Sequence, residues 1–259
     1  MRFCSLGSGS SGNATLIEAS DGARTTRLLV DCGFTLRELK KRLALHGLAP
    51  DDIDAVFVTH EHNDHVGCAF ALLRRHGTPV WASEGTWRAA CRRAALPPGT
   101  HIARDAEAIV VAGLEITPIA VPHDAAEPLQ LTVTDGRSRL GVLTDLGHGP
   151  PAVVSRLATC HALLLECNHD AQMLADGPYP FMLKRRIGGA HGHLANHQAA
   201  AILRQCTHPG LRHVVAAHLS RQNNRRDLAA ATIAEVLGTL PHDIVVADAS
   251  GGSPWLDLR

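Results

Sequence analysis

The sequence predicts an α/β protein whose strand-rich halves and interspersed helices suggest two sheets covered on the outside by helices. Short apolar runs bounded by turn residues alternate along the chain with longer stretches of helical periodicity. The length of 259 residues and the hydrophobic content of 45% suffice for a sizeable core. Because no repeat, low-complexity tract or composition shift interrupts the sequence, we expect a single domain over residues 1–259.

The first half of the chain contains strand-like runs separated by glycine-rich turns. A helix is expected after Thr35, because Thr35 and Glu38 have the spacing of a capping box, and it should stop at Gly47. In chain order, the expected elements are strands at 2–6, 14–19 and 27–31, the helix at 36–46, a buried strand at 53–59, a helix at 65–76 and a strand at 79–82.

The second half is richer in strands. Two strands are expected around Gly113 within 109–122, and a hairpin over 130–145 should turn near Asp135 and Gly136. The elements expected after the hairpin are a helix at 153–158, a strand at 162–167, helices at 179–187 and 196–206, a strand at 213–218, a helix at 228–237 and a strand at 243–247.

The histidine and cysteine contents are unusual. The chain has 17 histidines, and histidine is both the commonest metal ligand and an acid or base that titrates near neutral pH. Its seven cysteines are widely spread, which is typical of free thiols in a reducing compartment. The sequence also shows no signal-peptide pattern and no apolar run of about 18 residues that would span a membrane. We therefore expect a cytoplasmic protein without a membrane partner.

Net charge and aromatic content limit what the protein can bind through general properties. The formal net charge is zero, so affinity for phosphate has to come from local patches rather than from a global field. Aromatic residues make up 3% of the chain, which argues against the broad base-stacking platforms of single-strand binding proteins. The sequence leaves the oligomeric state open, a homodimer included.

The stretch T-H-E-H-N-D-H-V-G at 59–67 places four potential metal ligands at the end of a buried strand: His60, His62, Asp64 and His65. His60 and His62 lie on the same side of an extended segment, and Asp64 and His65 begin a helix. Four ligands are too many for one metal that keeps a position open for water, so the spacing favours two metals. Nitrogen and oxygen ligands without thiolates fit Zn²⁺, Mn²⁺ or iron. The alternative is a solvated polar loop.

This stretch resembles the H-x-H-x-D-H signature of the metallo-β-lactamase superfamily, and the resemblance extends along nearly the whole chain. It implies a four-layer αβ/βα sandwich of metallo-β-lactamase type. It also implies a role for Asp31 in L-L-V-D-C-G, which would orient the metal-binding loop. The ligand set that the resemblance implies is His60, His62 and His123 for one divalent metal ion, Asp64, His65 and His218 for the second, and Asp145 spanning both.

Repulsion between two adjacent cations explains the demand for shared ligands. Cations about 3.5–4 Å apart need a bridging carboxylate and a bridging hydroxide. The metals lower the pKa of the parent water, so the hydroxide is the nucleophile at neutral pH. Asp64 then counts among the catalytic residues as well as among the ligands. Taken singly, His123 and Asp145 also fit a solvated histidine and a simple turn.

Three further stretches resemble the YycJ/WalJ group of the superfamily, which is related to ribonuclease Z and ribonuclease J. They are S-L-G-S-G-S-S-G-N-A near the N-terminus, H-L-S-R-Q-N-N from His218, and G-H-L-A-N at 192–196. The resemblance implies a 5′-to-3′ exonuclease acting on DNA. Ala195 replaces the usual serine, which calls a hydroxyl contact at that position into question. The chain shows neither the inserted domain of ribonuclease J nor the long arm of ribonuclease Z, which favours a compact nuclease.

The parallel with ribonuclease Z also implies a catalytic pair. Glu166 in L-L-L-E-C-N-H-D would orient His193 and keep it protonated. His193 would then assist the leaving alkoxide as a general acid or stabilise charge on the phosphate. The alternative is that Glu166 ends a strand as a solvated carboxylate and His193 caps a helix.

Basic clusters and polar loop residues indicate where phosphates would bind. Basic residues precede His193 and follow His218, and such groups neutralise backbone phosphates, although a solvated face is the plainer interpretation of 184–186. The glycine-rich stretch at 7–13 fits either backbone N–H donation to phosphate or a tight turn. The residues concerned are Lys184, Arg185, Arg186, Arg221, Arg225 and Arg226, together with Ser220, Asn223 and Asn224, which should line the site because they share a loop with His218.

The sequence thus predicts a metal-dependent hydrolase with two divalent ions, Zn²⁺ or Mn²⁺, that cleaves phosphodiesters of nucleic acid, DNA before RNA. A small-molecule hydrolase acting on a thioester, lactone or β-lactam with the same metal core stays open as an alternative. A metal-dependent binding module without turnover is a third interpretation. The native metal and the polarity of digestion are not fixed by the sequence.

Overall fold

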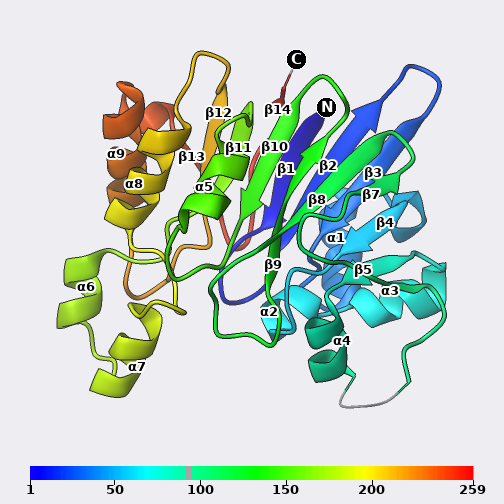
Figure 1. The fold of residues 1–259 in the computed structure, drawn as a ribbon, viewed down its shortest axis with the longest axis horizontal. Coiled ribbons are helices and arrows are strands. Elements are labelled where there is room, and N and C mark those ends of the chain that lie inside the picture. Colours follow the sequence, from blue (N-terminus) through cyan, green and yellow to red (C-terminus); the bar gives the residue numbers. More distant parts are fainter. Residues whose placement is uncertain (92–94, 259) are drawn as a thin grey trace.

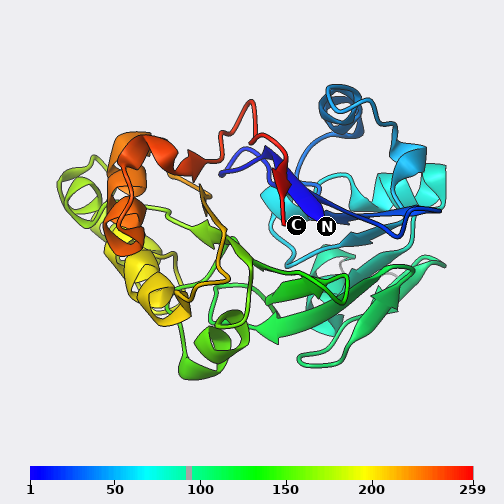
Figure 2. The ribbon, with the colours of Figure 1, turned by 90° about the horizontal axis from the view of Figure 1, so that it is seen from above.

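The computed structural model describes residues 1–91 and 95–258, and its strands form two seven-stranded sheets that lie face to face (Figure 1, Figure 2). In spatial order the first sheet contains β14 (Leu256–Asp257), β1 (Arg2–Gly7), β2 (Ala14–Ser20), β3 (Thr25–Val30), β4 (Ala55–Phe57), β5 (Val80–Ala82) and β6 (Thr100–Ile102). The second contains β13 (Val245–Val246), β12 (His213–Ala217), β11 (Ala162–Glu166), β10 (Arg139–Leu143), β9 (Leu129–Thr134), β8 (Leu114–Ala120) and β7 (Ile109–Val111).

Helices cover the outer faces of both sheets. Outside the first sheet lie α1 (Leu36–Ala44), α3 (Ala69–His76) and α4 (Glu84–Ala90), and outside the second lie α5 (Pro151–Leu157), α8 (Asn196–Cys206) and α9 (Arg226–Leu237). Shorter elements are α2 (Asn63–Val66), α6 (Ala171–Asp176), α7 (Phe181–Ile187) and the 3₁₀ turns at Pro50–Asp52 and Pro241–Asp243. The predicted four-layer αβ/βα sandwich is confirmed.

Three apolar clusters hold the four layers together. Between the sheets, Phe3 and Phe57 pack with Leu131 and Leu164 in one cluster that both sheets share. A second cluster joins α5, α8 and α9 to the outer face of their sheet, and a third joins α1, α3 and α4 to theirs. Because each sheet buries both faces, its parallel strands are continuous apolar runs, which is why the sequence pattern located them.

Helix α1 begins where the sequence predicts, but its cap is only half of a capping box. The Thr35 hydroxyl accepts a hydrogen bond from the Glu38 N–H at 3.2 Å. The Glu38 carboxylate does not return to Thr35, because it binds Arg42 one turn later at 2.9 Å. The helix ends at Ala44, two residues before the end that the sequence indicates.

The single helix expected over 65–76 is wrong, because the chain forms α2 and α3 with a break at Gly67 and Cys68. Gly67 has a φ of 27°, and a Cβ there would lie 2.3 Å from the carbonyl oxygen of Cys32. The loop after β4 therefore packs directly against the end of β3, and only glycine permits that approach. This contact fixes where the side chains of α2 point.

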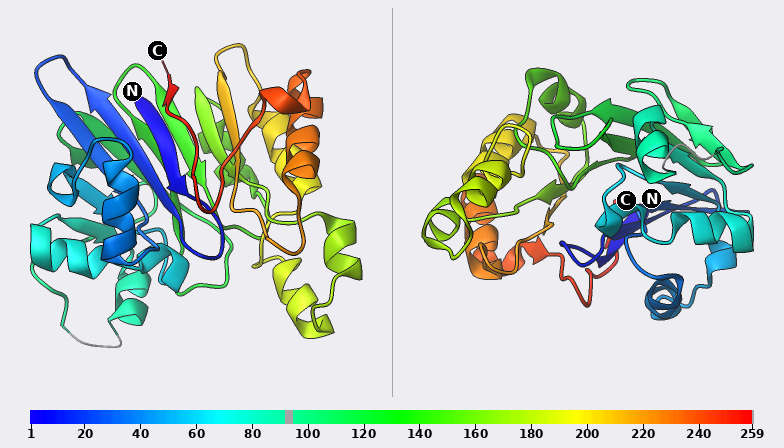
Figure 3. Two further views of the ribbon diagram at one scale, coloured as in Figure 1. Left: turned by 180° about the vertical axis from the view of Figure 1, so that it is seen from behind. Right: turned by 90° about the horizontal axis from the view of Figure 1, so that it is seen from below.

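The sequence pattern does not reveal α4, α6, β6, β14 or the two 3₁₀ turns. They have two to seven residues, too few for a readable period. β14 pairs with β1 through Phe3 and Leu256, so the two ends of the chain lie side by side (Figure 3). Within the described ranges, no helix is long and apolar enough to cross a membrane.

Candidate active site

The predicted ligands come from separate loops that meet at one edge of the two sheets. The loop after β4 carries His60 and His62, the loop after β8 carries His123, and the loops after β10 and β12 carry Asp145 and His218. Because β10, β11 and β12 are parallel, their carboxyl ends lie at the same edge. Residues far apart in sequence thereby reach one small volume.

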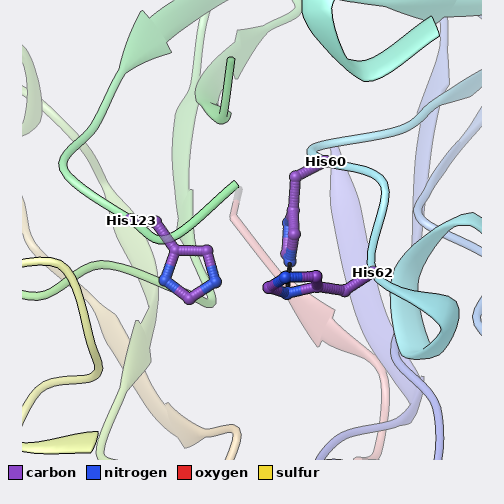
Figure 4. A group of neighbouring side chains, drawn as sticks. All are labelled: His60, His62 and His123. Carbon is purple, nitrogen blue, oxygen red and sulfur yellow. Dashed lines mark hydrogen bonds between the residues drawn. The ribbon is translucent and has the colours of Figure 1, made fainter. Parts of the chain in front are cut away.

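His60, His62 and His123 form the first ligand group, with their nitrogen atoms within 4.8 Å of one another (Figure 4). His60 Nε2 lies 3.0 Å from His62 Nδ1. On the outer side, His60 Nδ1 contacts the Thr59 hydroxyl at 3.0 Å, and His123 Nδ1 donates to the carbonyl oxygen of Gly192 at 3.0 Å. These outer contacts fix the rings so that the opposite nitrogens converge, which is the usual arrangement of metal-binding histidines.

Asp64, His65 and His218 form the second group. His65 Nδ1 donates to Asp31 at 2.8 Å, and His218 Nδ1 donates to the carbonyl oxygen of Thr144 at 2.6 Å. The Nε2 atoms of the two rings then face Asp64 Oδ2 at 3.6 Å and 3.7 Å. The structure thus places Asp31 against the outer nitrogen of His65.

Asp145 lies between the two groups. Its Oδ2 is 3.0 Å from His65 Nε2, and its Oδ1 is 3.9 Å from His123 Nε2. The carboxylate is fully enclosed, with 1% of the residue exposed. Its Oδ1 also lies 3.0 Å from His218 Nδ1, so the carboxylate contacts the second group with both oxygens and extends toward the first group with one.

The donor atoms fit divalent cations. His123 Nε2 and Asp145 Oδ2 are buried, yet neither makes an oriented hydrogen bond with any residue that the structure describes. Buried polar atoms nearly always make hydrogen bonds, so two buried atoms without one point to a ligand that the protein atoms do not supply. Imidazole and carboxylate donors without thiolate suit Zn²⁺ or Mn²⁺. The cluster and the fold indicate a divalent-metal site.

The two groups differ in their electrostatics. Burial, reinforced by the neighbouring His65, holds the pKa of His60 well below its usual value, and burial also lowers the pKa of His123. Burial would lower the pKa of His65 as well, but Asp145 and Asp31 outweigh it and raise that pKa to about 10. Asp145 likewise raises the pKa of His218. The second group therefore attracts positive charge more strongly, and a bound cation would replace protons there.

Two residues of the site have unusual backbone conformations. Asp31 has a φ of 60° and His218 a φ of 54°, in the left-handed region that side chains other than glycine seldom adopt. The His218 N–H donates to the Ser8 hydroxyl at 2.7 Å, and the Asp31 N–H donates to the carbonyl oxygen of Phe57 at 2.8 Å. Strain of this kind persists where surrounding contacts hold it, and it concentrates at functional sites.

Glu166 and His193 form a pair beside the ligand groups. Glu166 is 0% exposed, and its Oε2 accepts the N–H groups of Leu146 and Leu194 at 3.0 Å and 3.1 Å. His193 Nδ1 donates to Glu166 Oε1 at 2.7 Å and lies 3.3 Å from Asp145. A solvated Glu166 is therefore excluded, and His193 does not cap α8, whose N-cap residue is Ala195.

The pKa of His193 follows from this pair. Burial alone would lower the pKa of the imidazole, but the Glu166 carboxylate outweighs burial and raises it. Conversely, His193 keeps the pKa of Glu166 below its usual value despite complete burial. The pair therefore favours the protonated imidazole, and His193 lines a cavity of about 210 Å³ that opens onto Asp64 and Asp145.

Ser220, Asn223 and Asn224 do not line that cavity. The Asn224 amide donates to the carbonyl oxygen of Cys167 at 2.7 Å and to the side chain of Asn196 at 2.9 Å. The Ser220 hydroxyl accepts the Asn223 N–H at 3.2 Å. These contacts tie the loop after β12 to the loop after β11 and to the start of α8.

The glycine-rich stretch forms a tight turn. The N–H groups of Ser8, Gly9 and Gly12 donate to Asp248, Asn13 and Gly9, so three donors already have protein acceptors. Gly9 and Gly12 have φ angles of 131° and 142°, which only glycine adopts readily.

The basic residues that follow His218 have acidic or polar partners. Arg221 donates to the Ser11 hydroxyl at 3.0 Å, and Arg226 pairs with Asp248 at 3.2 Å. Arg225 pairs with Asp227. In the cluster before His193, Arg186 pairs with Asp124 and also lines the cavity of the site.

Asn13 and Asp124 belong to the site although the sequence pattern did not single them out. The Asn13 amide is 3.4 Å from Asp64 Oδ2 and 3.1 Å from His65 Nε2. Asp124 lies 3.4 Å from His123 and lines the cavity. Both are adjacent to features that the sequence does show, the glycine-rich turn and His123, and their proximity to those features was the available signal.

Comparisons with known proteins agree with this geometry. The family model of the Beta-lactamase superfamily domain matches residues 26–219. Exodeoxyribonuclease YycJ of Bacillus anthracis is 32% identical over 244 residues, which cover 92% of this chain and 89% of that protein. Exodeoxyribonuclease WalJ of Streptococcus pneumoniae is 30% identical over 240 residues, which cover 91% and 88%.

Among solved structures, the metallo-beta-lactamase fold protein YhfI of Bacillus subtilis superimposes with a TM-score of 0.74 over 99% of both chains. Its sequence identity is 17%, so this likeness shows the fold. The chain therefore belongs to the beta-lactamase superfamily and, within it, to the group that includes YycJ and WalJ, and it is a metal-dependent hydrolase.

Proposed function

We propose that the protein is a dinuclear-metal phosphodiesterase that digests DNA as a 5′-to-3′ exonuclease. The observation that carries the proposal is the buried Glu166–His193 pair, which places an imidazole 3.3 Å from the central carboxylate of Asp145. The exonuclease mode and the DNA substrate are supported by the names of YycJ and WalJ. The direction of digestion is what the resemblance to that group implies.

In this proposal His60, His62 and His123 would hold one divalent ion and Asp64, His65 and His218 a second, and Asp145 would contribute to both. Bound Zn²⁺ or Mn²⁺ would neutralise charge on the phosphate and activate the attacking water. Neighbouring groups of the chain orient the histidine rings. Asp31 fixes the ring of His65, and the carbonyl oxygens of Gly192 and Thr144 fix the rings of His123 and His218. Each ring thereby keeps the tautomer that leaves its inner nitrogen available.

His193 then acts on the leaving group. Its Nδ1–H is held by Glu166, which leaves Nε2 for the cavity. Cleavage of a phosphodiester expels an alkoxide, a poor leaving group, so a proton donated from Nε2 lowers the barrier. Glu166 positions the ring and favours its protonated form.

Hydrolysis of a thioester, lactone or β-lactam is the weaker alternative on this geometry. The cavity of about 210 Å³ is smaller than the roughly 300–1,000 Å³ of pockets that enclose small ligands. Polar groups such as Asp64, Arg186 and His193 line it. A phosphodiester presented from a polymer needs only its phosphate inside such a cavity, with the flanking nucleotides over the surface.

Digestion of end-labelled nucleic acid tests the proposal. Zn²⁺- and Mn²⁺-loaded protein should shorten DNA from its 5′ end, with labelled RNA and 3′-labelled DNA as the comparison substrates. Asp64→Ala protein should be at least about 100-fold slower, because it loses a ligand of the second group. If Asp64→Ala protein cut as fast as wild type, the two-metal mechanism would be lost.

A substrate panel separates the proposal from its alternative. The loaded protein should hydrolyse bis-p-nitrophenyl phosphate and leave lactones and thioesters intact. Rapid turnover of a lactone or thioester, with no hydrolysis of any phosphodiester, would favour the small-molecule hydrolase. Failure to hydrolyse any substrate with fully loaded protein would favour the binding module.

A further inference from the structure

Helix α7 exposes two large apolar side chains next to the active site. Phe181 is 70% exposed and Met182 is 71% exposed, and no residue of α7 is buried. The helices α6 and α7 stand away from the two sheets, on the same side of the molecule as α8 (Figure 1, Figure 3). In the part of the chain that the structure describes, Phe181 is the one aromatic residue among the large hydrophobic side chains that are exposed. In a chain with 3% aromatic residues, such a position is uncommon.

The same helix forms part of the wall of the active-site cavity. Leu183, Arg186 and Ile187, which share one helical face, line the cavity together with His193. The carbonyl oxygen of Ile187 accepts the His193 N–H at 2.8 Å, so the end of α7 and the proposed general acid are fixed relative to each other. A group bound on α7 would therefore have a defined distance from the reacting phosphate.

Helical spacing gives a path from the cavity to the exposed side chains. Arg186 and Met182 are four residues apart and are neighbours on the helix surface, and Arg185 and Phe181 are neighbours for the same reason. The Arg185 guanidinium lies 5.8 Å from the centroid of the Phe181 ring. Arg185 forms no ion pair with any described residue, whereas Arg186 pairs with Asp124. A bound polymer strand that leaves the cavity past Arg186 thus meets Met182 first, and then Phe181 together with Arg185.

We propose that α7 is a stacking platform for single-stranded DNA, on which Phe181 stacks a base one or two nucleotides away from the phosphodiester that is cleaved. The inference rests on the proposed nuclease function and identifies how that site recognises its substrate. Every base offers a π-face, so one exposed aromatic ring beside cationic side chains binds a strand without regard to sequence. Met182 supports the sugar and base edge, and Arg185 and Arg186 neutralise phosphates on either side.

Charge favours DNA over a second copy of this chain as the partner of this surface. Three consecutive cationic residues, Lys184, Arg185 and Arg186, accompany the two apolar side chains on a seven-residue helix. Two copies of α7 facing each other would bring these like charges together, whereas a polyanion matches them. The cavity that the helix borders is also where the scissile phosphate would lie.

The kinetics of Phe181 variants on single-stranded oligonucleotides test the platform. Phe181→Ala should raise KM by about 5- to 100-fold, the range expected for one lost base-stacking contact, with a smaller change in kcat. Phe181→Tyr should keep KM within about twofold of wild type, because the ring is retained. Leu45→Ala is the matched control, since Leu45 is 81% exposed at the end of α1 and its removal should leave KM unchanged.

Oligonucleotides with single abasic positions locate the stacked base. The penalty of Phe181→Ala should disappear when the base at one position near the scissile phosphate is missing, and it should persist for abasic positions elsewhere. A penalty that is the same at every position, or a KM that Phe181→Ala does not change, would overturn the platform.

Three further outcomes separate this inference from the nuclease proposal and from an interface between copies of the chain. If wild-type protein hydrolysed bis-p-nitrophenyl phosphate but no oligonucleotide, the nuclease proposal itself would fail. If oligonucleotides were digested with an unchanged KM in Phe181→Ala, the nuclease proposal would stand and only the platform would fail. A wild-type dimer in analytical ultracentrifugation that dissociates in Phe181→Ala would show that the surface is an interface between copies, against the platform.

Discussion

The two halves of the molecule supply the active site in different ways. The N-terminal half provides its ligands from one short stretch, and their rings are held by side chains, His65 by Asp31 and His60 by Thr59. The C-terminal half, taken from His123 onward, provides one group per loop. Its rings are held by backbone carbonyl oxygens, His123 by that of Gly192 and His218 by that of Thr144. The hydrogen-bonded pair of Glu166 and His193 comes from the C-terminal half alone.

This difference divides the chemical tasks. The N-terminal stretch can hold metal but carries no group placed to protonate a leaving oxygen. The C-terminal half completes both candidate ligand groups and adds the Glu166–His193 pair, and its backbone contacts cannot be removed by a single substitution. Substitutions next to the ligands should therefore lower metal affinity more in the N-terminal half than in the C-terminal half. Only substitutions in the C-terminal half should affect proton transfer.

The largest effect is expected for Asp145, the residue shared by both ligand groups. Asp145→Ala should lower the rate of phosphodiester hydrolysis by about 10³-fold or more and should abolish retention of both metals, because each group loses its common carboxylate. Asp64→Ala should lose the metal of the second group and keep that of His60, His62 and His123. Metal content after desalting, measured by elemental analysis beside activity, checks both. Equal metal loss in the two variants would contradict the division into two groups.

The next effect belongs to the Glu166–His193 pair. His193→Ala should slow DNA cleavage by about 10²- to 10⁴-fold, the range for loss of a general acid, and should slow bis-p-nitrophenyl phosphate hydrolysis much less, because p-nitrophenolate leaves without a proton. Comparing kcat for the two substrates separates proton donation from a structural role. An equal loss on both substrates would assign His193 to metal or phosphate binding instead.

The pH profile gives a second readout of the pair. Activity on DNA should fall on the alkaline side as His193 loses its proton. Because the Glu166 carboxylate raises the pKa of His193, Glu166→Gln should move this limb to lower pH. The limb should be absent from the profile of p-nitrophenyl ester hydrolysis, where no proton is needed. An alkaline limb that Glu166→Gln does not move would contradict the assignment.

The sequence predicted the N-terminal part of the site more completely than the C-terminal part, because the N-terminal candidates lie in one stretch and the C-terminal candidates lie in separate loops. His60, His62, Asp64 and His65 are adjacent in the chain, so their density is visible without a fold. His123 and His218 become meaningful only when parallel strands bring their loops together, and here the family resemblance supplied what local pattern could not. Ser220, Asn223 and Asn224 share a loop with His218, yet the Asn224 side chain turns toward Asn196 and Cys167, and the Ser220 hydroxyl accepts the Asn223 N–H within the loop.

The fold shows the same limit. Long apolar runs such as β11 and β12 were predictable because both faces are buried. The break in the helix at 65–76 was not, because it depends on the contact of Gly67 with Cys32, a residue that lies 35 positions earlier in the sequence. Breaks of this kind depend on contacts between residues that are far apart in sequence, and local periodicity does not reveal those contacts.

Asp31 tests whether the N-terminal ligands depend on side-chain support. Asp31→Asn keeps the shape but removes the negative charge that orients His65 and favours its inner nitrogen as a ligand. Metal affinity should fall by about 10- to 100-fold, as for other second-sphere carboxylates, measured by competition with a chelator. Asp135→Asn, a change at the hairpin turn far from the site, is the control. Unchanged affinity in Asp31→Asn would show that the backbone alone fixes the loop.

The smallest effect is expected at Ala195, where the YycJ/WalJ resemblance implies serine. Ala195 is the N-cap of α8 and is 2% exposed, with extended backbone angles of −71° and 157° and no side-chain acceptor for the first turn. The Gln198 side chain already accepts the Ala195 N–H at 2.8 Å, which is one half of a capping box. Ala195→Ser would supply the other half and should stabilise the protein by about 1 kcal/mol, a rise in Tm of about 2–4 °C, without changing kcat/KM on DNA. Thermal unfolding and DNA kinetics of the same preparation decide between a cap and a substrate contact, since faster DNA cleavage at an unchanged Tm would mean that the hydroxyl reaches the substrate.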